Sequence, residues 1–215
     1  LGTKKLRKEH LDFSEKFIDF FCEKLVRKKV KKQFGGKLKA FVSGGGALDH
    51  KIGEFLNSIG LPTLQGYGLT EASPVVSCNI PGKIHIETVG PPFKSNLVKI
   101  ADDGEILVKG QNVMLGYWNM KKETEEVIKN GWLHTGDIGE ITNEGNLKIT
   151  DRKKELIINL GGDNISPTKL ENLLCLNENI KQSYVYGDKK NYLVALIVTD
   201  YMENKEKIKE FINNM

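Results

Sequence analysis

Gln65-Gly66-Tyr67-Gly68-Leu69-Thr70-Glu71 is the stretch of this sequence that decides its fold. It holds two glycines, an aromatic ring, a hydroxyl and a carboxylate within seven residues. An aromatic ring can stack on a nucleotide base, a hydroxyl can bond a phosphate, and carboxylate oxygens are ligands of Mg²⁺. The stretch therefore predicts a nucleotide site.

The residues around this stretch predict a parallel pair of strands. Residues 38–43 suit a buried strand that runs into Gly44-Gly45-Gly46, and residues 61–65 suit a second strand. The segment between them predicts a helix closed by Gly60, whose apolar face consists of Ile52, Phe55, Leu56 and Ile59. A strand–helix–strand unit gives parallel strands, and ligands bind at their carboxyl ends. Both glycine-rich segments are expected at those ends.

The pattern of predicted secondary structure changes near residue 96. Two hairpins are expected, with strands at 98–100 and 105–108 and then at 138–142 and 146–150, and a short polar helix lies near 122–129. We therefore expect residues 1–95 to be the distal part of an α/β nucleotide-binding domain and residues 96–150 to be a β subdomain.

A charged linker, the expected hinge at residues 151–155, precedes a last, small α+β unit at residues 156–215. This unit is expected to hold a strand at 156–160 and a helix with Ser166 as N-cap and Pro167 in its first turn. A hairpin with strands at 182–186 and 192–198 and a polar helix from Asn204 follow.

Composition limits the class of protein. With 39% hydrophobic residues and 22 glycines the chain is globular and loop-rich. It contains no apolar run of about 18 residues that would span a membrane. Cys22, Cys78 and Cys175 lie far apart without metal-type spacing, so we expect reduced thiols and a cytoplasmic protein.

The positive charge is concentrated at the start of the chain. Residues 1–39 hold 13 Lys and Arg against 5 Asp and Glu, whereas the whole chain carries a net charge of +4. Phe13, Phe17, Phe21 and Leu25 predict an amphipathic helix that ends at Gly35-Gly36. A core-packing helix with a solvated basic end is favoured, and peripheral contact with the inner face of a membrane is the alternative. No aromatic-interleaved basic patch points to nucleic acid.

Two later segments add polar groups suited to a nucleotide. Trp132-Leu133-His134-Thr135-Gly136-Asp137 ends in a carboxylate, which can accept hydrogen bonds from both hydroxyls of a ribose. Asp151-Arg152-Lys153-Lys154-Glu155 holds a guanidinium, whose planar fork suits phosphate. Taken alone, His134 is expected to be structural, Trp132 a core aromatic, and the charged run a solvated surface.

These segments together resemble the adenylate-forming superfamily of acyl-CoA synthetases, adenylation domains and luciferases. Residues 65–71, 132–137 and 151–154 occur in the order and rough spacing of that superfamily. Residues 73–77, 131–139 and 192–198 are similar to its long-chain fatty acid–CoA ligase branch. The resemblance implies an α/β fold, namely part of the large domain with its β subdomain and an incomplete C-terminal domain.

The resemblance also implies a role for each matching residue. Thr70 would bond the adenylate phosphate, Glu71 would hold Mg²⁺, and Arg152 would contact ribose and phosphate. Asp137 would bind the ribose, and Tyr67 would lie against adenine. Lys154 would be the hinge about which the C-terminal domain rotates. The remaining residues implied at the nucleotide are Gly45, Gly46, Ala47, Gln65, Gly66 and Gly68; the family more often has Ser-Gly-Gly-Ala-Pro near residues 43–47, so Gly46 departs from it.

The implied reaction is activation of a long-chain fatty acid. Its carboxylate attacks the α-phosphate of ATP to give acyl-adenylate and pyrophosphate, and the thiolate of CoA then displaces AMP. The implied substrates and cofactors are ATP, Mg²⁺, CoA and a fatty acid.

Two family motifs are missing: a Ser/Thr/Gly-rich phosphate loop ending in Lys, and a Gly-Lys segment near the C-terminus. We therefore expect an internal piece of an enzyme, inactive alone in ATP–pyrophosphate exchange with palmitate. The alternative is a catalytically inactive, nucleotide-binding remnant of such an enzyme.

Overall fold

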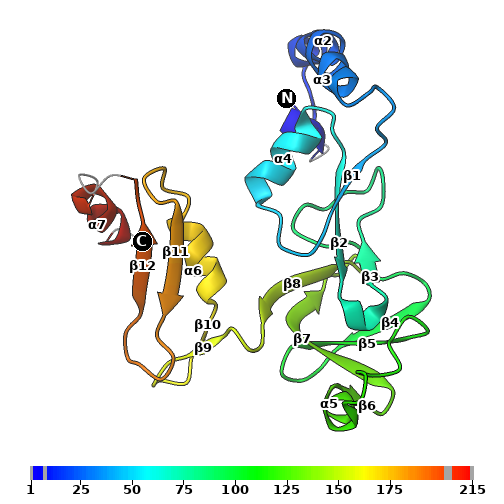
Figure 1. The fold of residues 1–215 in the computed structure, drawn as a ribbon. Coiled ribbons are helices and arrows are strands. Elements are labelled where there is room, and N and C mark those ends of the chain that lie inside the picture. The colour runs from blue at the N-terminus through cyan, green and yellow to red at the C-terminus, as the bar shows by residue number, and fades with distance from the viewer. Residues whose placement is uncertain (1, 7–8, 201–204, 214–215) are drawn as a thin grey trace. The chain divides into compact units, whose positions relative to one another are not determined.

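The structure of the chain is a computed structural model that describes residues 2–6, 9–200 and 205–213. The chain forms two compact units, which are described separately (Figure 1). The first unit contains Leu1–Thr135 and Gly139–Thr150, and the second contains Gly136–Ile138 and Asp151–Met215. Apart from residues 136–138, the segments predicted as the α/β part and as the β subdomain thus lie in one unit, and the predicted charged linker at residues 151–155 begins where the second unit resumes.

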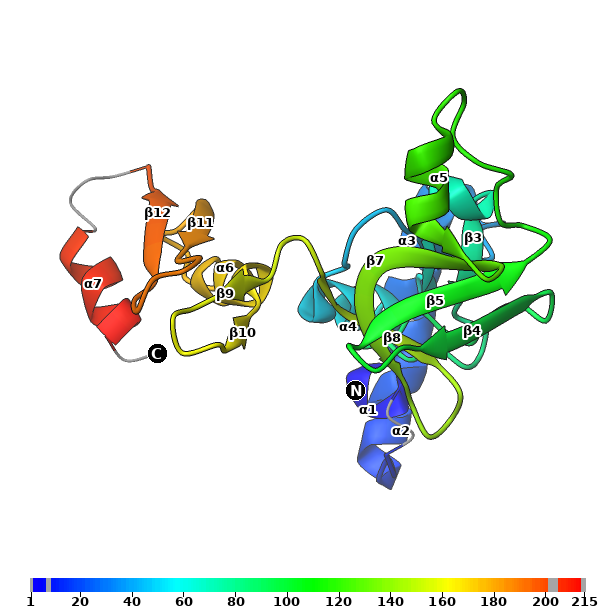
Figure 2. The same cartoon turned by 90° about the horizontal axis from the view of Figure 1, so that it is seen from below.

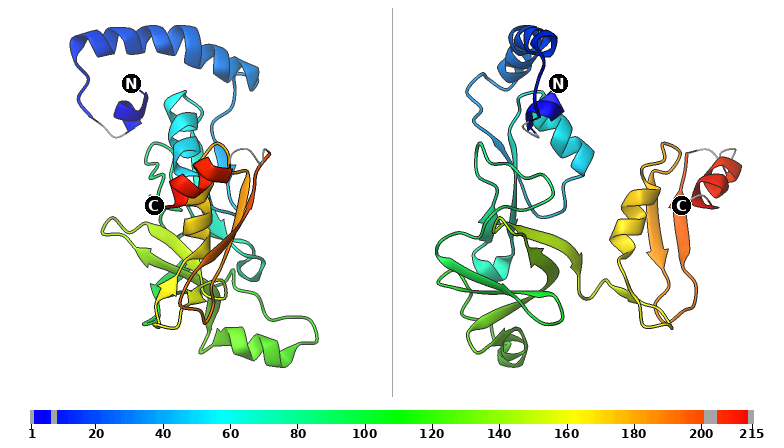
Figure 3. Two further views of the ribbon diagram at one scale, coloured as in Figure 1. Left: turned by 90° about the vertical axis from the view of Figure 1, so that its left-hand side faces the viewer. Right: turned by 180° about the vertical axis from the view of Figure 1, so that it is seen from behind.

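A long helix follows the short helix α1 (Gly2–Leu6) at the start of the first unit (Figure 3). It consists of α2 (Phe13–Cys22), a π-helical turn (Glu23–Arg27) and α3 (Lys28–Gln33). Asp12 caps its first turn because its Oδ1 accepts a hydrogen bond from the backbone N–H of Glu15 at 2.8 Å. Gly35 and Gly36 both have positive φ angles, so the helix ends where glycine permits a left-handed backbone.

The apolar face of this helix is exposed, which differs from the favoured prediction that it packs against a core. Phe13 is 89% exposed and Phe17 is 63% exposed. The buried residues of the helix are instead Asp19 and Arg27. The prediction was wrong for the described residues because the helix is tied to its neighbour by polar groups and not by its phenylalanines.

A three-stranded sheet carries the glycine-rich segments. Strand β1 (Phe41–Ser43) pairs in parallel with β2 (Thr63–Gly68), and helix α4 (His50–Ser58) connects them, which confirms the predicted strand–helix–strand unit. Strand β3 (Val75–Cys78) pairs antiparallel with the other edge of β2. Strand β1 is shorter than predicted, and its Val42 is 71% exposed, so β1 is not the buried strand that was predicted.

A five-stranded sheet contains most of the remaining strand residues of the first unit (Figure 2). It contains β4 (Asn96–Ile100), β5 (Glu105–Gly110), β6 (Ile128–Lys129), β7 (Trp132–Ile141) and β8 (Leu147–Arg152), with α5 (Lys121–Val127) before β6. Both predicted hairpins and the polar helix are present, and the second hairpin is longer than predicted. A buried cluster joins this sheet to the first one; its members are Tyr67, Ala72, Val76, Ile106, Val108, Leu133 and Leu147.

The second unit has its own small core. After the pair β9 (Ile157–Ile158) and β10 (Asn164–Ile165) come α6 (Pro167–Leu174), the antiparallel strands β11 (Gln182–Tyr186) and β12 (Val194–Val198), and α7 (Lys205–Asn213). The Ser166 hydroxyl accepts a hydrogen bond from the backbone N–H of Lys169 at 3.2 Å, which confirms the predicted cap. The predicted start of the last helix, Asn204, lies outside the described residues. The buried cluster consists of Ile157, Leu174, Ile180, Val185 and Ile208.

No helix among the described residues combines the length and apolar character needed to cross a bilayer.

Candidate functional site

The signature stretch, residues 65–71, occupies the end of β2 and the turn that follows it. Gly68 closes the strand where the backbone passes Pro74, and a Cβ at this position would lie 2.0 Å from the Pro74 carbonyl oxygen. No residue with a side chain fits there without moving the backbone. Thr70–Ala72 then form a single 3₁₀ turn. The strand extends beyond the predicted residue 65 because β3 continues to pair with it.

The glycine-rich loop lies beside the signature because β1 and β2 are parallel neighbours. Ser43 pairs with Gln65, and a Cβ on Gly44 would lie 3.3 Å from the Gly66 carbonyl oxygen. The exposed loop contains Gly45, with φ of +82°, together with Gly46 and Ala47. The structure therefore brings this predicted base-flanking loop next to the first residues of the signature.

Gln65 has a different environment from the other predicted nucleotide residues. It is 9% exposed, and its side-chain amide donates to the Ile86 carbonyl oxygen. Its Oε1 accepts a hydrogen bond from the Leu48 N–H at 3.4 Å. The Gln65 side chain thus connects two loops, and contact between it and a nucleotide stays a prediction.

Thr70 presents its side chain to solvent in the turn. The N-cap position of the turn is Leu69 and carries no side-chain cap bond, so Thr70 is not a helix cap. Within the described residues, the Thr70 hydroxyl has no hydrogen-bond partner. Such a hydroxyl is available to an oxyanion.

Tyr67 belongs to the buried cluster of the first unit and is 7% exposed. Its ring therefore packs mainly against protein, and Val76 and Ala72 belong to the same cluster. Stacking of this ring on adenine stays a prediction.

Glu71 has a partner that the sequence did not reveal. The hydroxyl of Tyr117 donates a hydrogen bond of 2.8 Å to Glu71 Oε1. This hydrogen bond, together with burial and the negative charge of the carboxylate, raises the pKa of Tyr117 above its ordinary 10.0. No local sequence pattern pairs two residues that are 46 positions apart.

The Glu71 carboxylate fits the Mg²⁺ that the family implies. It is half-buried, and its Oε2 receives no hydrogen bond from the residues that the structure describes. No group of three or more His, Cys, Asp or Glu side chains suited to a metal occurs among those residues. Mg²⁺ is commonly held by one or two carboxylates together with water and substrate phosphates. A single carboxylate with one available oxygen meets that requirement.

The second unit holds the other two charged residues predicted at the nucleotide. Asp137 lies on β7 and is 9% exposed, and its Oδ1 is 3.2 Å from Nε of Arg152 at the end of β8. The backbone N–H of Lys153 donates to the Gly136 carbonyl oxygen at 2.8 Å, which fixes the two segments side by side. The Arg152 side chain remains 58% exposed. The pair offers a carboxylate and a guanidinium at one place, as ribose and phosphate require.

Lys154 follows this pair in a turn between β8 and β9 and is exposed. No hydrogen bond or ion pair engages its side chain within the described residues. Its function as a hinge stays a prediction. Gly161 and Gly162 form the turn between β9 and β10, and Gly162 has a φ of +86°.

The segment before Asp137 is held by polar contacts to neighbouring strands. His134 Nδ1 lies 3.1 Å from Oε2 of Glu105, and the Thr135 hydroxyl donates to the Ile106 carbonyl oxygen at 2.8 Å. Trp132 is half-exposed, with Lys99 Nζ 4.4 Å from its ring centroid, so it is not a core aromatic. His134 has the structural environment that the sequence led us to expect.

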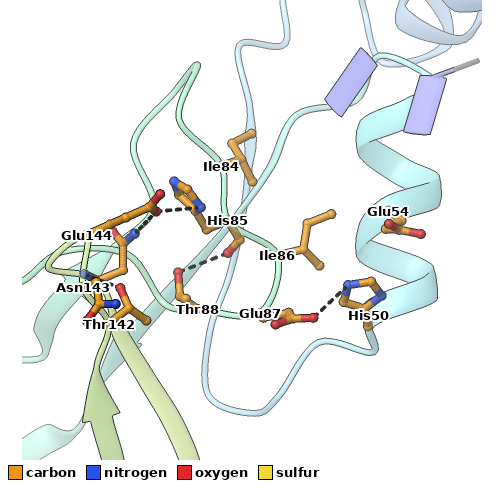
Figure 4. A pocket seen from close by; sticks show the side chains of 11 residues that line it. His50, Glu54, Ile84, His85, Ile86, Glu87, Thr88, Thr142, Asn143 and Glu144 are labelled. Atoms are coloured by element: carbon orange, nitrogen blue, oxygen red, sulfur yellow. Dashed lines mark hydrogen bonds and ion pairs between the residues drawn. The ribbon is translucent and has the colours of Figure 1, made fainter. Parts of the chain in front are cut away.

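A cavity of about 650 Å³ opens elsewhere on the first unit (Figure 4). Two His–Glu pairs line it: His50 with Glu87 at 3.6 Å, and His85 with Glu144 at 3.4 Å (Figure 4). Its lining residues include none of those predicted for the nucleotide. We therefore place the candidate site at the signature turn and not in this cavity.

Comparison with known proteins shows which proteins this chain is similar to. The long-chain-fatty-acid–CoA ligase FadD15 of Mycobacterium tuberculosis is 42% identical over 178 residues, which are 83% of this chain and 30% of that protein. Human long-chain-fatty-acid–CoA ligase 1 is 35% identical in an alignment of 192 residues that covers 83% of this chain and 28% of that protein. The chain thus spans about three tenths of the length of these curated relatives.

Solved structures show the same fold. The o-succinylbenzoate CoA synthetase of Bacillus subtilis, in complex with its acyl-adenylate intermediate, is similar with a TM-score of 0.73 and 28% identity, covering 87% of this chain and 43% of that one. The same enzyme with ATP and magnesium ion has a TM-score of 0.68 and 30% identity, covering 85% and 43%. The fold is therefore that of adenylate-forming enzymes. The family described as AMP-binding enzyme matches residues 11–118, half of the chain, and it is to this family that the chain belongs.

Proposed function

We propose that this chain carries the nucleotide-handling part of a long-chain fatty acid–CoA ligase. In that reaction a fatty acid carboxylate attacks the α-phosphate of ATP and releases pyrophosphate, and the thiolate of CoA then displaces AMP from the acyl-adenylate. The observation that carries the proposal is the signature turn, where Thr70 offers a hydroxyl and Glu71 a carboxylate oxygen beside the glycine-rich loop.

Each charged residue has a proposed part in the first step. Mg²⁺ would neutralise phosphate charge when it is bound by Glu71, and the Thr70 hydroxyl would bond the α-phosphate. Asp137 would accept hydrogen bonds from the ribose hydroxyls, and Arg152 would contact ribose and phosphate. Rotation of the second unit about Lys154 would precede the attack by CoA.

The names of the relatives support the choice of substrate. FadD15 and human ligase 1 are both named long-chain-fatty-acid–CoA ligases, and this chain aligns with each over 83% of its length. For this chain, the long-chain acid and CoA are proposals that rest on those names.

Calorimetry tests the nucleotide site directly. The 215-residue chain is titrated with a non-hydrolysable mimic of palmitoyl-adenylate, and the Asp137→Ala variant is the control. We expect saturable binding that weakens by at least tenfold in the variant, because a ribose contact and the partner of Arg152 are both lost. A folded chain that does not bind the mimic would contradict the proposal and favour the inactive remnant.

Peripheral membrane contact through the helix of α2 and α3 stays a prediction. The exposed Phe13 and Phe17 and the exposed Lys28 and Lys29 support it. Sedimentation with phosphatidylglycerol vesicles tests it, with phosphatidylcholine vesicles and the Phe17→Ser variant as controls. Equal sedimentation with both lipids, or none, would exclude an anionic-membrane site on this helix.

A further inference from the structure

The loop before α5 is fastened to the signature turn at three points. Asn112 Nδ2 donates to the Ala72 carbonyl oxygen at 2.9 Å, and the backbone N–H of Met114 donates to the Glu71 carbonyl oxygen at 2.8 Å. The third contact is the hydrogen bond of 2.8 Å from the Tyr117 hydroxyl to Glu71 Oε1. Two of these bonds fix the backbone of the turn, and the third fixes the carboxylate itself.

Tyr117 is in turn held by the first turn of α5. Its backbone N–H donates to the Thr124 hydroxyl at 2.9 Å, and that hydroxyl donates to the Met120 carbonyl oxygen at 2.7 Å. The tyrosine is half-buried. The backbone from which the Tyr117 side chain extends toward Glu71 is therefore held in place.

We propose that Tyr117 is a positioning residue for Glu71, which holds one carboxylate oxygen so that the other faces the divalent cation. This inference rests on the proposed function, in which Glu71 binds Mg²⁺. A glutamate side chain has three rotatable bonds, and ordering it costs free energy that an existing hydrogen bond has already offset. The hydrogen bond uses one acceptor position of Oε1, and it leaves both acceptor positions of Oε2 available to the cation.

The proposed role of Tyr117 differs from that of a hydrogen bond that only stabilises the backbone of the turn. The Asn112 and Met114 bonds end on backbone carbonyl oxygens, so they shape the turn whichever side chain stands at position 71. The Tyr117 bond ends on the side chain and sets its direction. Loss of the hydroxyl should therefore weaken cation binding while the turn keeps its backbone structure.

Nuclear magnetic resonance with a paramagnetic ion measures both properties. The ¹⁵N-labelled 215-residue chain is titrated with the Mn²⁺ complex of a non-hydrolysable ATP analogue, and broadening of the Leu69 and Ala72 amide signals reports the ion near Glu71. Tyr117→Phe removes only the hydroxyl, and Glu71→Gln removes the carboxylate charge. Tyr192→Phe is the matched control because Tyr192 is 60% exposed and far along the chain.

We expect Tyr117→Phe to raise the half-saturating concentration by roughly five- to tenfold, the size of the net contribution of one typical hydrogen bond. Glu71→Gln should abolish the broadening, and Tyr192→Phe should leave it unchanged. The Met114 amide should keep its slow hydrogen exchange in Tyr117→Phe, which shows that the turn is intact.

Each of the other possible results contradicts a specific part of the proposal. Wild-type binding in Tyr117→Phe, with loss in Glu71→Gln, overturns the role of Tyr117 and leaves the metal role of Glu71 standing. Broadening that Glu71→Gln does not change, or none in the wild-type chain, overturns both the metal role and this inference. Fast exchange at Met114 in Tyr117→Phe would show that the tyrosine supports the turn and does not position the carboxylate.

Discussion

At the scale of single residues, the glycines predicted at the nucleotide differ in whether the fold leaves room for a side chain. Gly68 passes so close to Pro74 that a Cβ would meet the Pro74 carbonyl oxygen at 2.0 Å, whereas a Cβ at Gly46 would have no neighbour within 4 Å. Gly68 is therefore required by packing of the backbone. Gly46 is free to change without affecting stability.

Substitution of these two glycines tests that difference. Gly68→Ala should lower the free energy of unfolding by about 1–3 kcal/mol, because strand β3 must move away from β2. Gly46→Ala should change it by less than about 0.5 kcal/mol. Urea unfolding followed by fluorescence measures both values. Equal effects of the two substitutions would contradict the close approach at Pro74.

The cysteines give a second test at this scale. Burial raises the pKa of the Cys78 thiol above its ordinary 9.0, while Cys175 is exposed. The thiolate is the reactive form, so at pH 8 iodoacetamide should label Cys175 first and Cys78 much more slowly. The Cys78 rate should still rise as the pH passes 9, because its raised pKa leaves most of the thiol protonated at that pH. Mass spectrometry of timed samples decides, and faster labelling of Cys78 would contradict its burial.

At the scale of elements, the long N-terminal helix is attached by charge and not by its apolar face. Arg27 is 7% exposed; its Nε donates to the Ser58 carbonyl oxygen at 3.0 Å, and an Nη lies 2.7 Å from Asp19 Oδ1. Ser58 ends α4, so this arginine connects the π-helical turn to that helix. The Phe face beside it remains open.

Removal of the Arg27 side chain should accordingly lower the free energy of unfolding. Arg27→Ala removes the guanidinium that lies 2.7 Å from the buried Asp19 carboxylate, and breaking such a buried ion pair typically lowers the free energy of unfolding by about 3–5 kcal/mol. The double variant Asp19→Asn with Arg27→Met removes both charges and should recover most of this loss. Thermal unfolding of the three proteins measures it. A single variant as stable as the wild type would show that the pair does not hold the helix.

At the scale of the whole molecule, the chain has two separate cores. The first contains Leu147 at 0% exposure, and the second contains Val185 at 5% exposure. Each core lies within one of the two compact units. Two cores without shared members predict that the units can unfold separately.

Calorimetric unfolding tests this independence. Leu147→Ala should lower the free energy of unfolding of the first unit alone, by about 2–5 kcal/mol for a lost core side chain. Ser166→Ala removes the cap of α6 and should lower the free energy of unfolding of the second unit alone, by about 1 kcal/mol. One cooperative transition that moves with both substitutions would exclude independent units.

Local sequence features determined most of the elements. Alternating apolar residues, glycine turns and the Ser166 cap act between near neighbours, so both hairpins of the sheet, the crossover helix and α6 could be predicted. The identity of the signature likewise follows from seven consecutive residues. Burial of β1 and of the N-terminal phenylalanines was predicted wrongly, because exposure depends on what lies over a face and not on the periodicity of the face.

The sequence by itself determined the family resemblance, the order of the elements and the types of groups available to a nucleotide. Only the tertiary structure decided which groups meet: Tyr117 with Glu71, Arg152 with Asp137, and Arg27 with Asp19 and Ser58. A hydrogen bond requires its two atoms to lie about 3 Å apart. For residues as far apart in sequence as Tyr117 and Glu71, the path of the folded backbone brings the atoms that close, and local propensity does not encode it.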